Sequence, residues 1–268
     1  MVIVVTGDAG HGLYTPGKRT PDDEREWSFN DKVIRAFEAE LNNYEGVTFK
    51  RLDDPTGQTD VPLQTRTDKA NALGSRVHVS FHHNANAGTY WGDWGGVETY
   101  VYKTTLADSM ALAKAVHSKN VNAYGLRDRG IKASDLHMVR ETAMTAILTE
   151  GGFMDSTTDI GKLRDNNVLR NSGIAIAQGV AEYLGLKRKT APVPTEQFVY
   201  FTTGGFTNGQ AIEKFMNFVR DNKFGTSAKL DNFTLSFTTG DYSKGGAAYS
   251  KMKGFMVDNG IWYQEFTR

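Results

Sequence analysis

The chain has 268 residues, of which 39% are hydrophobic, and its 31 basic and 31 acidic side chains give a formal net charge of zero. A chain of this length and composition can form one large domain and a smaller one, and its neutral charge gives no reason to expect a nucleic-acid partner. It contains no cysteine, which excludes disulfides and thiolate ligands and leaves His, Asp and Glu as the strong candidate metal ligands.

Along its first two thirds the chain alternates short β-rich runs with helical patterns. This order predicts an α/β fold with a mostly parallel, twisted sheet flanked by helices. Ligands of open α/β sheets bind beyond the carboxyl ends of the strands, so the residues that follow strands are the candidates for a site. The expected strands are 2–6, 77–81, 97–102 and 145–149, and the expected helices are 30–41, 106–124 and 170–184.

A basic and then proline-rich segment, residues 187–196, separates two parts of the chain and shows no apolar periodicity. We interpret it as a linker between a domain of residues 1–186 and a smaller one of residues 197–268. In the smaller part, Phe201-Thr202-Thr203-Gly204 recurs 36 residues later as Phe237-Thr238-Thr239-Gly240, and each copy leads into a helical pattern. The duplication predicts a second small α/β domain of repeated β-α units, with strands at 198–203, 233–239 and 261–266.

Two segments with histidines follow predicted strands. His11 lies between Gly10 and Gly12, which let the backbone turn tightly while the imidazole projects; a plain structural turn explains this segment equally well. His82 and His83 follow the strand at 77–81. Because side chains alternate along a strand, only one of these two is expected to join His11, and the residues alone leave the choice open.

Carboxylates in two further segments are candidates to complete a site. A catalytic zinc usually has three protein ligands and one open position, and the acidic segment 22–26 precedes a predicted helix. Acidic residues at that place also complement the helix dipole without any metal. Glu150 ends an apolar strand, where desolvation raises the pKa of a carboxyl group and suits it to general base or acid catalysis. Capping of the next turn is the alternative for Glu150.

In this order the segments resemble the amidase-3 family of zinc-dependent N-acetylmuramoyl-L-alanine amidases, over residues 1–186. The chain departs from the family where it reads Gly-Asp-Ala-Gly-His instead of the more frequent Asp-Pro-Gly-His, and in Trp27 after the acidic segment. The motifs that carry the resemblance are Gly10-His11-Gly12, Glu26, Ser80-Phe81-His82-His83-Asn84-Ala85 and Glu150-Gly151-Gly152-Phe153. Supporting matches are Leu63-x-x-Arg66, Gly96-Val97-Glu98-Thr99-Tyr100, Arg129-Gly130-Ile131-Lys132 and Met138-Val139-Arg140.

The resemblance implies one Zn²⁺ per catalytic domain, held by His11, Glu26 and His82, with Glu150 as the catalytic carboxylate. It implies hydrolysis of the amide bond between N-acetylmuramic acid and L-alanine in peptidoglycan, and hence lysis of bacterial cell walls. In this reaction zinc activates a water, from which Glu150 takes the proton before protonating the departing amine.

The family pattern also resolves two choices. It selects His82 over His83, and it favours Glu26 over Glu24 because Asn30 and the apolar stripe then fall where the family has them. Five further residues are expected as possible substrate-binding groups, and for each of them a structural role is at least an equal alternative. These residues are Asn84, Trp91, Trp94, His137 and Arg140.

Two rival functions use the same features. The first is a zinc peptidase that cuts within the peptidoglycan stem peptide, and the second is a non-catalytic wall-binding protein that has kept the fold. Residues 197–268 are expected to form a cell-wall-binding module, because their repeat loosely resembles the sporulation-related glycan-binding repeat; a dimerisation or regulatory domain is the alternative.

The N-terminus has no basic leader, and its apolar stretch is too short for a secretory signal. No run of about 18 apolar residues could span a bilayer, so no membrane insertion is expected. We therefore expect synthesis in a host cytoplasm without a signal peptide and action on the cell wall. With the two-domain plan this favours a bacteriophage endolysin released by a holin, and a mother-cell lytic enzyme of a spore former would have the same features.

Overall fold

The computed structural model describes residues 2–189, 198–206, 208–231 and 234–267, and the chain divides into two compact units, Met1–Lys189 and Thr190–Arg268. The first residues of the predicted linker pack on the first unit. Arg188 forms an ion pair with Glu40, and the Lys189 N–H donates to the Asn43 carbonyl. The rest of the predicted linker, residues 190–196, lies outside the described residues.

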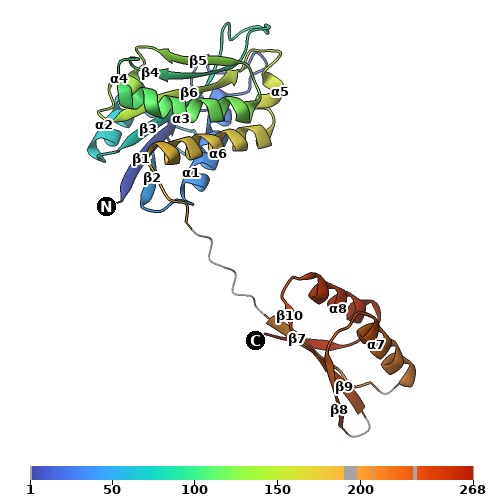
Figure 1. The fold of residues 1–268 in the computed structure, drawn as a ribbon. Helices are drawn as coiled ribbons and strands as arrows, with labels where there is room; N and C mark the ends of the chain where they lie inside the picture. The colour runs from blue at the N-terminus through green and yellow to red at the C-terminus, as the bar shows by residue number, and fades with distance from the viewer. Residues whose placement is uncertain (1, 190–197, 207, 232–233, 268) are drawn as a thin grey trace. The chain divides into compact units, whose positions relative to one another are not determined.

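The first unit is built on a six-stranded sheet with the strand order β2-β1-β3-β6-β4-β5 (Figure 1). β4 is antiparallel to β6 and every other neighbouring pair is parallel, which confirms the expected mostly parallel sheet. The strands are β1 (Ile3–Ala9), β2 (Val47–Arg51), β3 (Val77–Asn84), β4 (Val97–Val101), β5 (Asp128–Ala133) and β6 (Thr145–Phe153).

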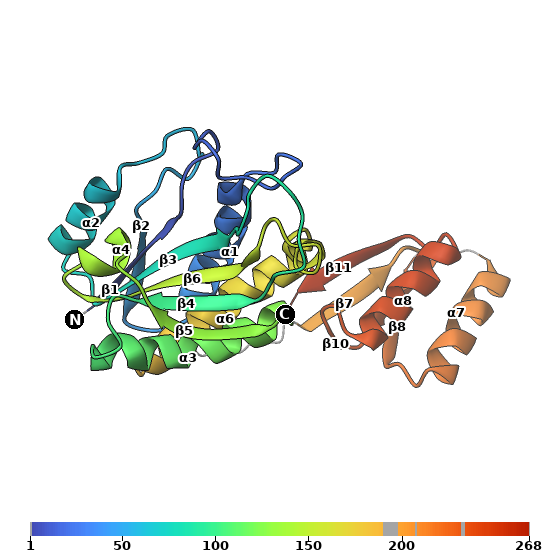
Figure 2. The same cartoon turned by 90° about the horizontal axis from the view of Figure 1, so that it is seen from above.

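Helices cover the two faces of this sheet unequally. On one face α1, α6 and α3 pack side by side over the main hydrophobic core (Figures 1 and 2). The other face carries the short helices α2 and α4 over a smaller cluster around Leu148. Among the described residues, no helix is long and apolar enough to cross a membrane. The helices are α1 (Glu26–Leu41), α2 (Leu63–Ala72), α3 (Ala107–Tyr124), α4 (His137–Arg140), α5 (Ile160–Leu163) and α6 (Asn166–Tyr183).

The apolar stripe predicted for the first helix is buried in this core. Val33, Ile34, Phe37 and Leu41 are each at most 2% exposed, because helical spacing places them all on the face that meets the sheet and α6. α6 approaches α1 very closely at Gly173, where an added Cβ would lie 2.2 Å from the Val33 carbonyl oxygen. Only glycine fits there, and α1 is thereby held in a fixed position above the sheet.

Three strands continue past the ends expected from their apolar runs. β1, β3 and β6 extend beyond Thr6, Phe81 and Thr149, because main-chain pairing does not require apolar side chains. In the extended part of the sheet His82 pairs in register with Glu150. The candidate histidine and glutamate therefore lie at the carboxyl ends of strands and not in loops.

The second unit is an antiparallel sheet with both of its helices on one face (Figure 2). β7 pairs with β9, β10 and β11, and β9 pairs with β8. Its own hydrophobic core includes Phe201, Phe215, Phe237, Met252 and Met256. The elements are β7 (Phe198–Thr203), α7 (Gly209–Asp221), β8 (Thr226–Asp231), β9 (Thr234–Thr239), β10 (Tyr242–Ser243), α8 (Ala247–Asp258) and β11 (Tyr263–Thr267).

The duplicated β-α units are present in this second unit, but the expected β-α-β-α-β order is incomplete because it omits β8 and the two-residue strand β10. The two copies are β7-α7-β8 and β9-α8-β11, which is the split βαβ arrangement. β8 reads Thr-Ser-Ala-Lys-Leu-Asp and is mostly exposed, so it lacks the apolar alternation by which a strand is recognised.

Candidate active site

Three predicted site residues meet at the carboxyl ends of β1 and β3. The two oxygens of Glu26 contact the two imidazoles: Oε2 lies 3.3 Å from His11 Nε2, and Oε1 lies 3.0 Å from His82 Nδ1. One ligand atom from each of the three residues falls within a group less than 4.8 Å across. Glu24, the alternative carboxylate, instead forms an ion pair with Arg164 at 2.6 Å.

The loop that carries His11 is fixed by two features. Gly10 lies directly against His82, since an added Cβ would lie 2.1 Å from His82 Cε1, so only glycine permits this approach. His11 itself has a left-handed backbone, with φ at 65°. The buried guanidinium of Arg66 on α2 donates to the carbonyls of Ala9 and His11 at 2.8 and 3.2 Å and anchors the loop.

Glu26 is the first residue of α1 and is 2% exposed. Its Oε1 also accepts from Asn30 Nδ2 and from the His83 N–H, both at 3.3 Å. Burial raises the pKa of Glu26, but the hydrogen bond and the charge of His82 outweigh it and lower the pKa to about 2. The carboxylate is therefore ionised, and two N–H donors and the His82 ring nitrogen contact its Oε1.

The two adjacent histidines have different surroundings, as alternation along β3 predicts. Burial lowers the pKa of His82, but its bond to Glu26 outweighs burial and raises the pKa. His83 is buried, and its ring nitrogens contact Asn30 Oδ1 at 2.7 Å and Tyr124 Oη at 2.8 Å. Burial lowers the pKa of His83 to about 3, so it is a neutral packing and hydrogen-bonding group.

Glu150 lies near the end of β6, opposite His82 on β3 and opposite Glu98 on β4. Residues in register on adjacent strands point to the same face, so these three side chains share one face of the sheet. Among the described residues, the buried Oε2 of Glu150 has no hydrogen-bond partner. Burial raises the pKa of this carboxyl group to about 8. Buried oxygens without a partner are rare in folded proteins, and a catalytic role is one explanation for them.

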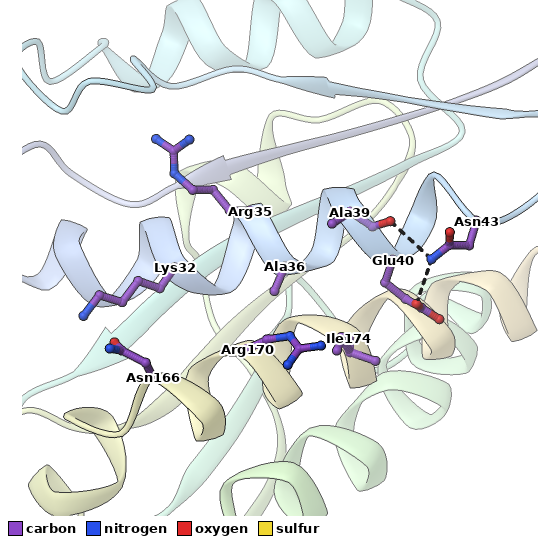
Figure 3. A pocket seen from close by; sticks show the side chains of 9 residues that line it. All are labelled: Lys32, Arg35, Ala36, Ala39, Glu40, Asn43, Asn166, Arg170 and Ile174. Carbon is purple, nitrogen blue, oxygen red and sulfur yellow. Dashed lines mark hydrogen bonds between the residues drawn. The ribbon is translucent and has the colours of Figure 1, made fainter. Parts of the chain in front are cut away.

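A hollow of about 240 Å³ borders the cluster and is lined by Gly10, His11, Arg66 and His82 together with residues 60–63. A larger hollow of about 630 Å³ lies between α1 and α6 (Figure 3). Figure 3 shows Lys32, Arg35 and Arg170 around it, and none of the clustered histidines or glutamates lines it. Of these two hollows, the smaller one therefore reaches the cluster, through His11 and His82.

Two imidazoles and one carboxylate, with a hollow beside them, are a donor set that fits a catalytic transition metal. Zinc sites of catalytic type combine three such ligands with one open position, and the absence of cysteine leaves only nitrogen and oxygen donors. Glu150 shares a face with His82 but makes no hydrogen bond to the cluster. The arrangement can hold a metal and, separately, place a carboxyl group that exchanges a proton.

Comparison with known proteins agrees with this geometry: a family model described as N-acetylmuramoyl-L-alanine amidase matches residues 3–182. The chain belongs to the N-acetylmuramoyl-L-alanine amidase family. The match ends before the second unit begins. We refer to Met1–Lys189 as the amidase unit.

Individual relatives cover the same region. A sporulation-specific N-acetylmuramoyl-L-alanine amidase of Bacillus subtilis (strain 168) is 32% identical over 185 residues, which are 69% of each chain. The endolysin of Bacillus phage SPP1 is 34% identical over 190 residues, which are 68% of this chain and 66% of the endolysin. Among solved structures, the catalytic domain of the amidase CwlV from Bacillus (Paenibacillus) polymyxa var. colistinus is 30% identical with a TM-score of 0.63, and the match covers 69% of this chain and 100% of that domain.

Glu98 is a residue of the amidase unit for which no role was predicted from the sequence. It is 1% exposed, contacts Arg129 Nε and Lys132 Nζ, and accepts from Tyr100 Oη at 2.6 Å and Asn84 Nδ2 at 3.1 Å. Burial raises the pKa of Glu98, but these donors outweigh it and hold the pKa below its usual range. Its two cations lie 31 and 34 residues further along the chain, so Glu98 alone gave no signal of this role. The available signal was its place within the motif 96–100.

Three other polar residues were predicted to bind substrate, and the structure gives each of them different contacts. Asn84 is tied to the catalytic edge by its bond to Glu98. His137 begins α4 and contacts Thr67 Oγ1 on α2 at 3.2 Å. Arg140 is exposed, is paired with acidic neighbours and lines a separate hollow with residues 102, 106–109, 139 and 142–145, so the structure does not bring it to the cluster.

The two tryptophans of the amidase unit that were expected to bind sugar lie in the loop between β3 and β4. The Trp94 indole N–H donates to Asp155 Oδ1 at 2.7 Å, and Asp155 Oδ2 accepts three N–H groups of residues 86–88. Trp94 therefore packs this loop. The Trp91 ring faces the Arg164 guanidinium at 5.8 Å, and Tyr90 is the exposed aromatic of the loop, at 62%.

Proposed function

We propose that the amidase unit is a zinc-dependent N-acetylmuramoyl-L-alanine amidase that cleaves the bond between N-acetylmuramic acid and L-alanine in peptidoglycan. His11, Glu26 and His82 hold one Zn²⁺, and Glu150 is the general base and acid. The observation that carries this proposal is the three-ligand cluster beside a hollow, with a buried and unpartnered carboxyl oxygen on the same face of the sheet.

A bound zinc would supply Lewis-acid activation of the scissile carbonyl and of the attacking water. The chain's own groups provide the rest of the reaction. In its ionised form the Glu150 carboxylate takes one proton from the water as it attacks the carbonyl carbon, and then delivers that proton to the nitrogen as the carbon–nitrogen bond breaks. The products are a carboxylate on the lactyl group of muramic acid and a free amine on L-alanine.

Rigid positioning of the ligands supports this proposal. Asn30 orients Glu26 from one turn along α1, Arg66 anchors the His11 loop, and Gly10 lets His82 approach. Partners behind the ligands fix their orientation and tune the metal that they hold. The site is therefore built before substrate arrives, which lowers the cost of reaching the reactive geometry.

Metal content and product analysis test the proposal together. The purified protein is expected to carry about one zinc per chain, to lose hydrolysis of muropeptides on chelation, and to regain it with Zn²⁺. The products should be free lactyl-muramic acid and peptides with N-terminal L-alanine. New amines only within the stem peptide would assign the site to a peptidase, the rival that the same ligands permit.

The variant Glu150→Gln tests whether the chain is an enzyme or a non-catalytic wall-binding protein. We expect kcat to fall about 10²- to 10⁴-fold, since a general base and acid is lost, with zinc content unchanged. Hydrolysis at the wild-type rate in this variant would remove Glu150 from the reaction.

For the second unit we propose a role in holding the enzyme on the insoluble wall, where a tethered site raises the local concentration of enzyme. The similarity to the SPP1 endolysin supports a phage lytic enzyme that a holin releases, and the similarity to the B. subtilis sporulation amidase supports a lytic enzyme of a spore former. A holin gene beside the coding sequence would favour the first. Cosedimentation of the full chain with purified walls, compared with residues 1–189, tests the tether.

A further inference from the structure

The larger hollow of the amidase unit, about 630 Å³, is built by two long helices, α1 and α6 (Figure 3). Its lining residues follow one another at helical spacing on each helix, so each helix turns one continuous stripe of side chains toward it. A hollow of this size falls within the range of ligand sites. The lining residues are Lys32, Arg35, Ala36, Ala39, Glu40 and Asn43 on the side of α1, and Asn166, Arg170 and Ile174 on α6.

Small side chains on α1 keep this space open. Gly173 brings α6 so close that an added Cβ would lie 2.7 Å from the Ala36 Cβ. Beside this contact the apolar lining consists of Ala36, Ala39 and Ile174, and the described residues that line the hollow include no aromatic ring. Sugar rings and bases are usually held by stacking on aromatic side chains. The aliphatic lining instead suits a ligand with an open carbon chain.

Two cations that line the hollow have no partner. Among the described residues, the side chains of Lys32 and Arg170 form no hydrogen bond and no ion pair. Figure 3 shows Lys32 projecting from α1 and Arg170 from α6, so the two positive charges come from different walls. The third cation, Arg35, is held by Asp31 at 2.8 Å and donates to the Pro55 carbonyl at 2.8 Å.

The one acidic side chain among the described lining residues, Glu40, is already neutralised. Its Oε1 and Oε2 contact the Arg188 guanidinium at 2.5 and 3.2 Å, and Asn43 Nδ2 donates to Oε2 at 3.1 Å. Burial raises the pKa of Glu40, but these donors outweigh it and hold the pKa below its usual range. The charge that the hollow offers to a ligand is therefore positive.

Phosphate groups fit these two cations better than a single carboxylate does. An ammonium group binds phosphate as a point charge, and a guanidinium group binds it with two parallel N–H donors. Cations on two walls can contact successive anionic groups of one chain, and the carbons between those groups then lie on the aliphatic lining. Asn166, at the same end of the hollow as Lys32 in Figure 3, adds a carboxamide that can bind a hydroxyl group.

We propose that this hollow, which we call the α1–α6 hollow, binds a polymer of polyols joined by phosphodiesters, the kind of anionic polymer that is bonded to peptidoglycan in many bacterial walls. Lys32 and Arg170 contact phosphate oxygens, and the polyol carbons pack on Ala36, Ala39 and Ile174. The hollow shares no residue with the cluster of His11, Glu26 and His82. It is therefore a contact with the wall that is separate from the bond that is cleaved.

Titration calorimetry of the full chain with purified poly(glycerol phosphate) tests the proposal. Arg170→Gln and Lys32→Gln should each weaken binding about fivefold, because each removes one cation from the hollow. Arg170→Lys should restore part of it, since the charge is kept. Arg76→Gln is the matched control and should bind as the wild type, because Arg76 is an exposed arginine that lies outside the hollow and has no side-chain partner among the described residues.

A second variant separates an occupied hollow from attraction to a positive surface. Ala39→Leu fills part of the space without changing any charge, and Ala39 is exposed, so the longer side chain does not disturb the core. We expect this variant also to bind the polymer about fivefold more weakly, since the ligand loses its contact with the aliphatic lining. Circular dichroism melting checks that each variant is folded.

No binding by the wild type, unchanged binding by Ala39→Leu, or equal binding by Arg170→Gln and Arg76→Gln would each overturn the proposal. Phosphatidylglycerol vesicles and poly-L-glutamate carry negative charge on a lipid headgroup and on a polypeptide. Binding of either one as tightly as the polyol phosphate would assign the hollow to a membrane or to an acidic protein and overturn the proposal as well.

Hydrolysis of a soluble muropeptide keeps this result apart from the catalytic proposal. Arg170 lies on α6 and lines no part of the hollow beside the cluster, so Arg170→Gln should retain the wild-type rate. Failure of the wild type to bind the polymer, with normal hydrolysis, rejects the α1–α6 hollow alone.

Discussion

Two buried carboxylates of the amidase unit differ in the partners that surround them. Glu26 is 2% exposed and Glu98 is 1% exposed, and both lie near Glu150 at the same edge of the sheet. Glu26 contacts two imidazoles, His11 and His82. Glu98 contacts permanent cations, Arg129 and Lys132.

This difference separates the proposed metal ligand, Glu26, from a glutamate in a structural ion pair. An imidazole nitrogen can give up its proton and bind a metal in its place, whereas a guanidinium group cannot, and an ammonium group does so only at high cost. A buried glutamate among imidazoles is therefore able to share a metal with them. A buried glutamate whose oxygens contact Arg and Lys instead forms ion pairs that hold neighbouring strands together. Burial alone does not distinguish the two.

The largest effect is expected from Glu26→Ala. Zinc content should fall from about one per chain to near zero, and kcat/KM should fall more than about 100-fold, because loss of a ligand exceeds the loss of a residue behind a ligand. Elemental analysis and muropeptide hydrolysis measure both. Glu24→Ala is the matched control, since Glu24 pairs with Arg164 and should leave zinc and activity intact. Zinc loss in Glu24→Ala instead would reverse the assignment of the two glutamates.

A smaller effect is expected from Asn30→Ala. This change removes the amide that contacts Glu26 Oε1, the Gly10 carbonyl and His83 Nδ1, without removing a ligand. Zinc affinity should fall about 10- to 100-fold, measured by competition with a chelator. An unchanged affinity would show that the ligands are oriented without Asn30.

The smallest effect is expected from Glu98→Gln, which keeps the shape and removes the charge. Arg129 and Lys132 are partly exposed and can turn to water, so the free energy of unfolding should fall by only about 1–2 kcal/mol. Urea unfolding of the amidase unit measures it. Zinc content should stay at about one per chain; if this variant loses its zinc as Glu26→Ala does, the distinction between the two carboxylates fails.

Sequence patterns predicted an element correctly where the spacing of apolar residues or glycines directly reflects the backbone geometry. The stripe from Val33 to Leu41 predicted the helix that carries Glu26, and the glycines around His11 predicted a tight turn at a strand end. The apolar strand patterns at 77–81 and 145–149 also predicted that His82 and Glu150 lie at strand ends. In a parallel sheet these ends meet at one edge. Their metal-binding and catalytic roles remain predictions that the experiments above address.

Other features depend on contacts between distant residues and left no periodic signal. The strands β5 and β8 are polar and partly exposed, so apolar alternation is absent from both. The role of Glu98 depends on cations that reach it from β5, and that strand was itself not predicted. The carboxylate that binds the Trp94 indole, Asp155, lies 61 residues along the chain.

The reversed direction of β4 returns one long loop to the edge of the sheet where His82 and Glu150 lie. β3 ends at the catalytic edge, and β4, running opposite to β6, begins there, so the loop 85–96 both leaves and returns at that edge. Insertions or deletions in this loop would reshape the rim of the active site without shifting any strand register. Changes in this loop would therefore leave His11, Glu26, His82 and Glu150 in place.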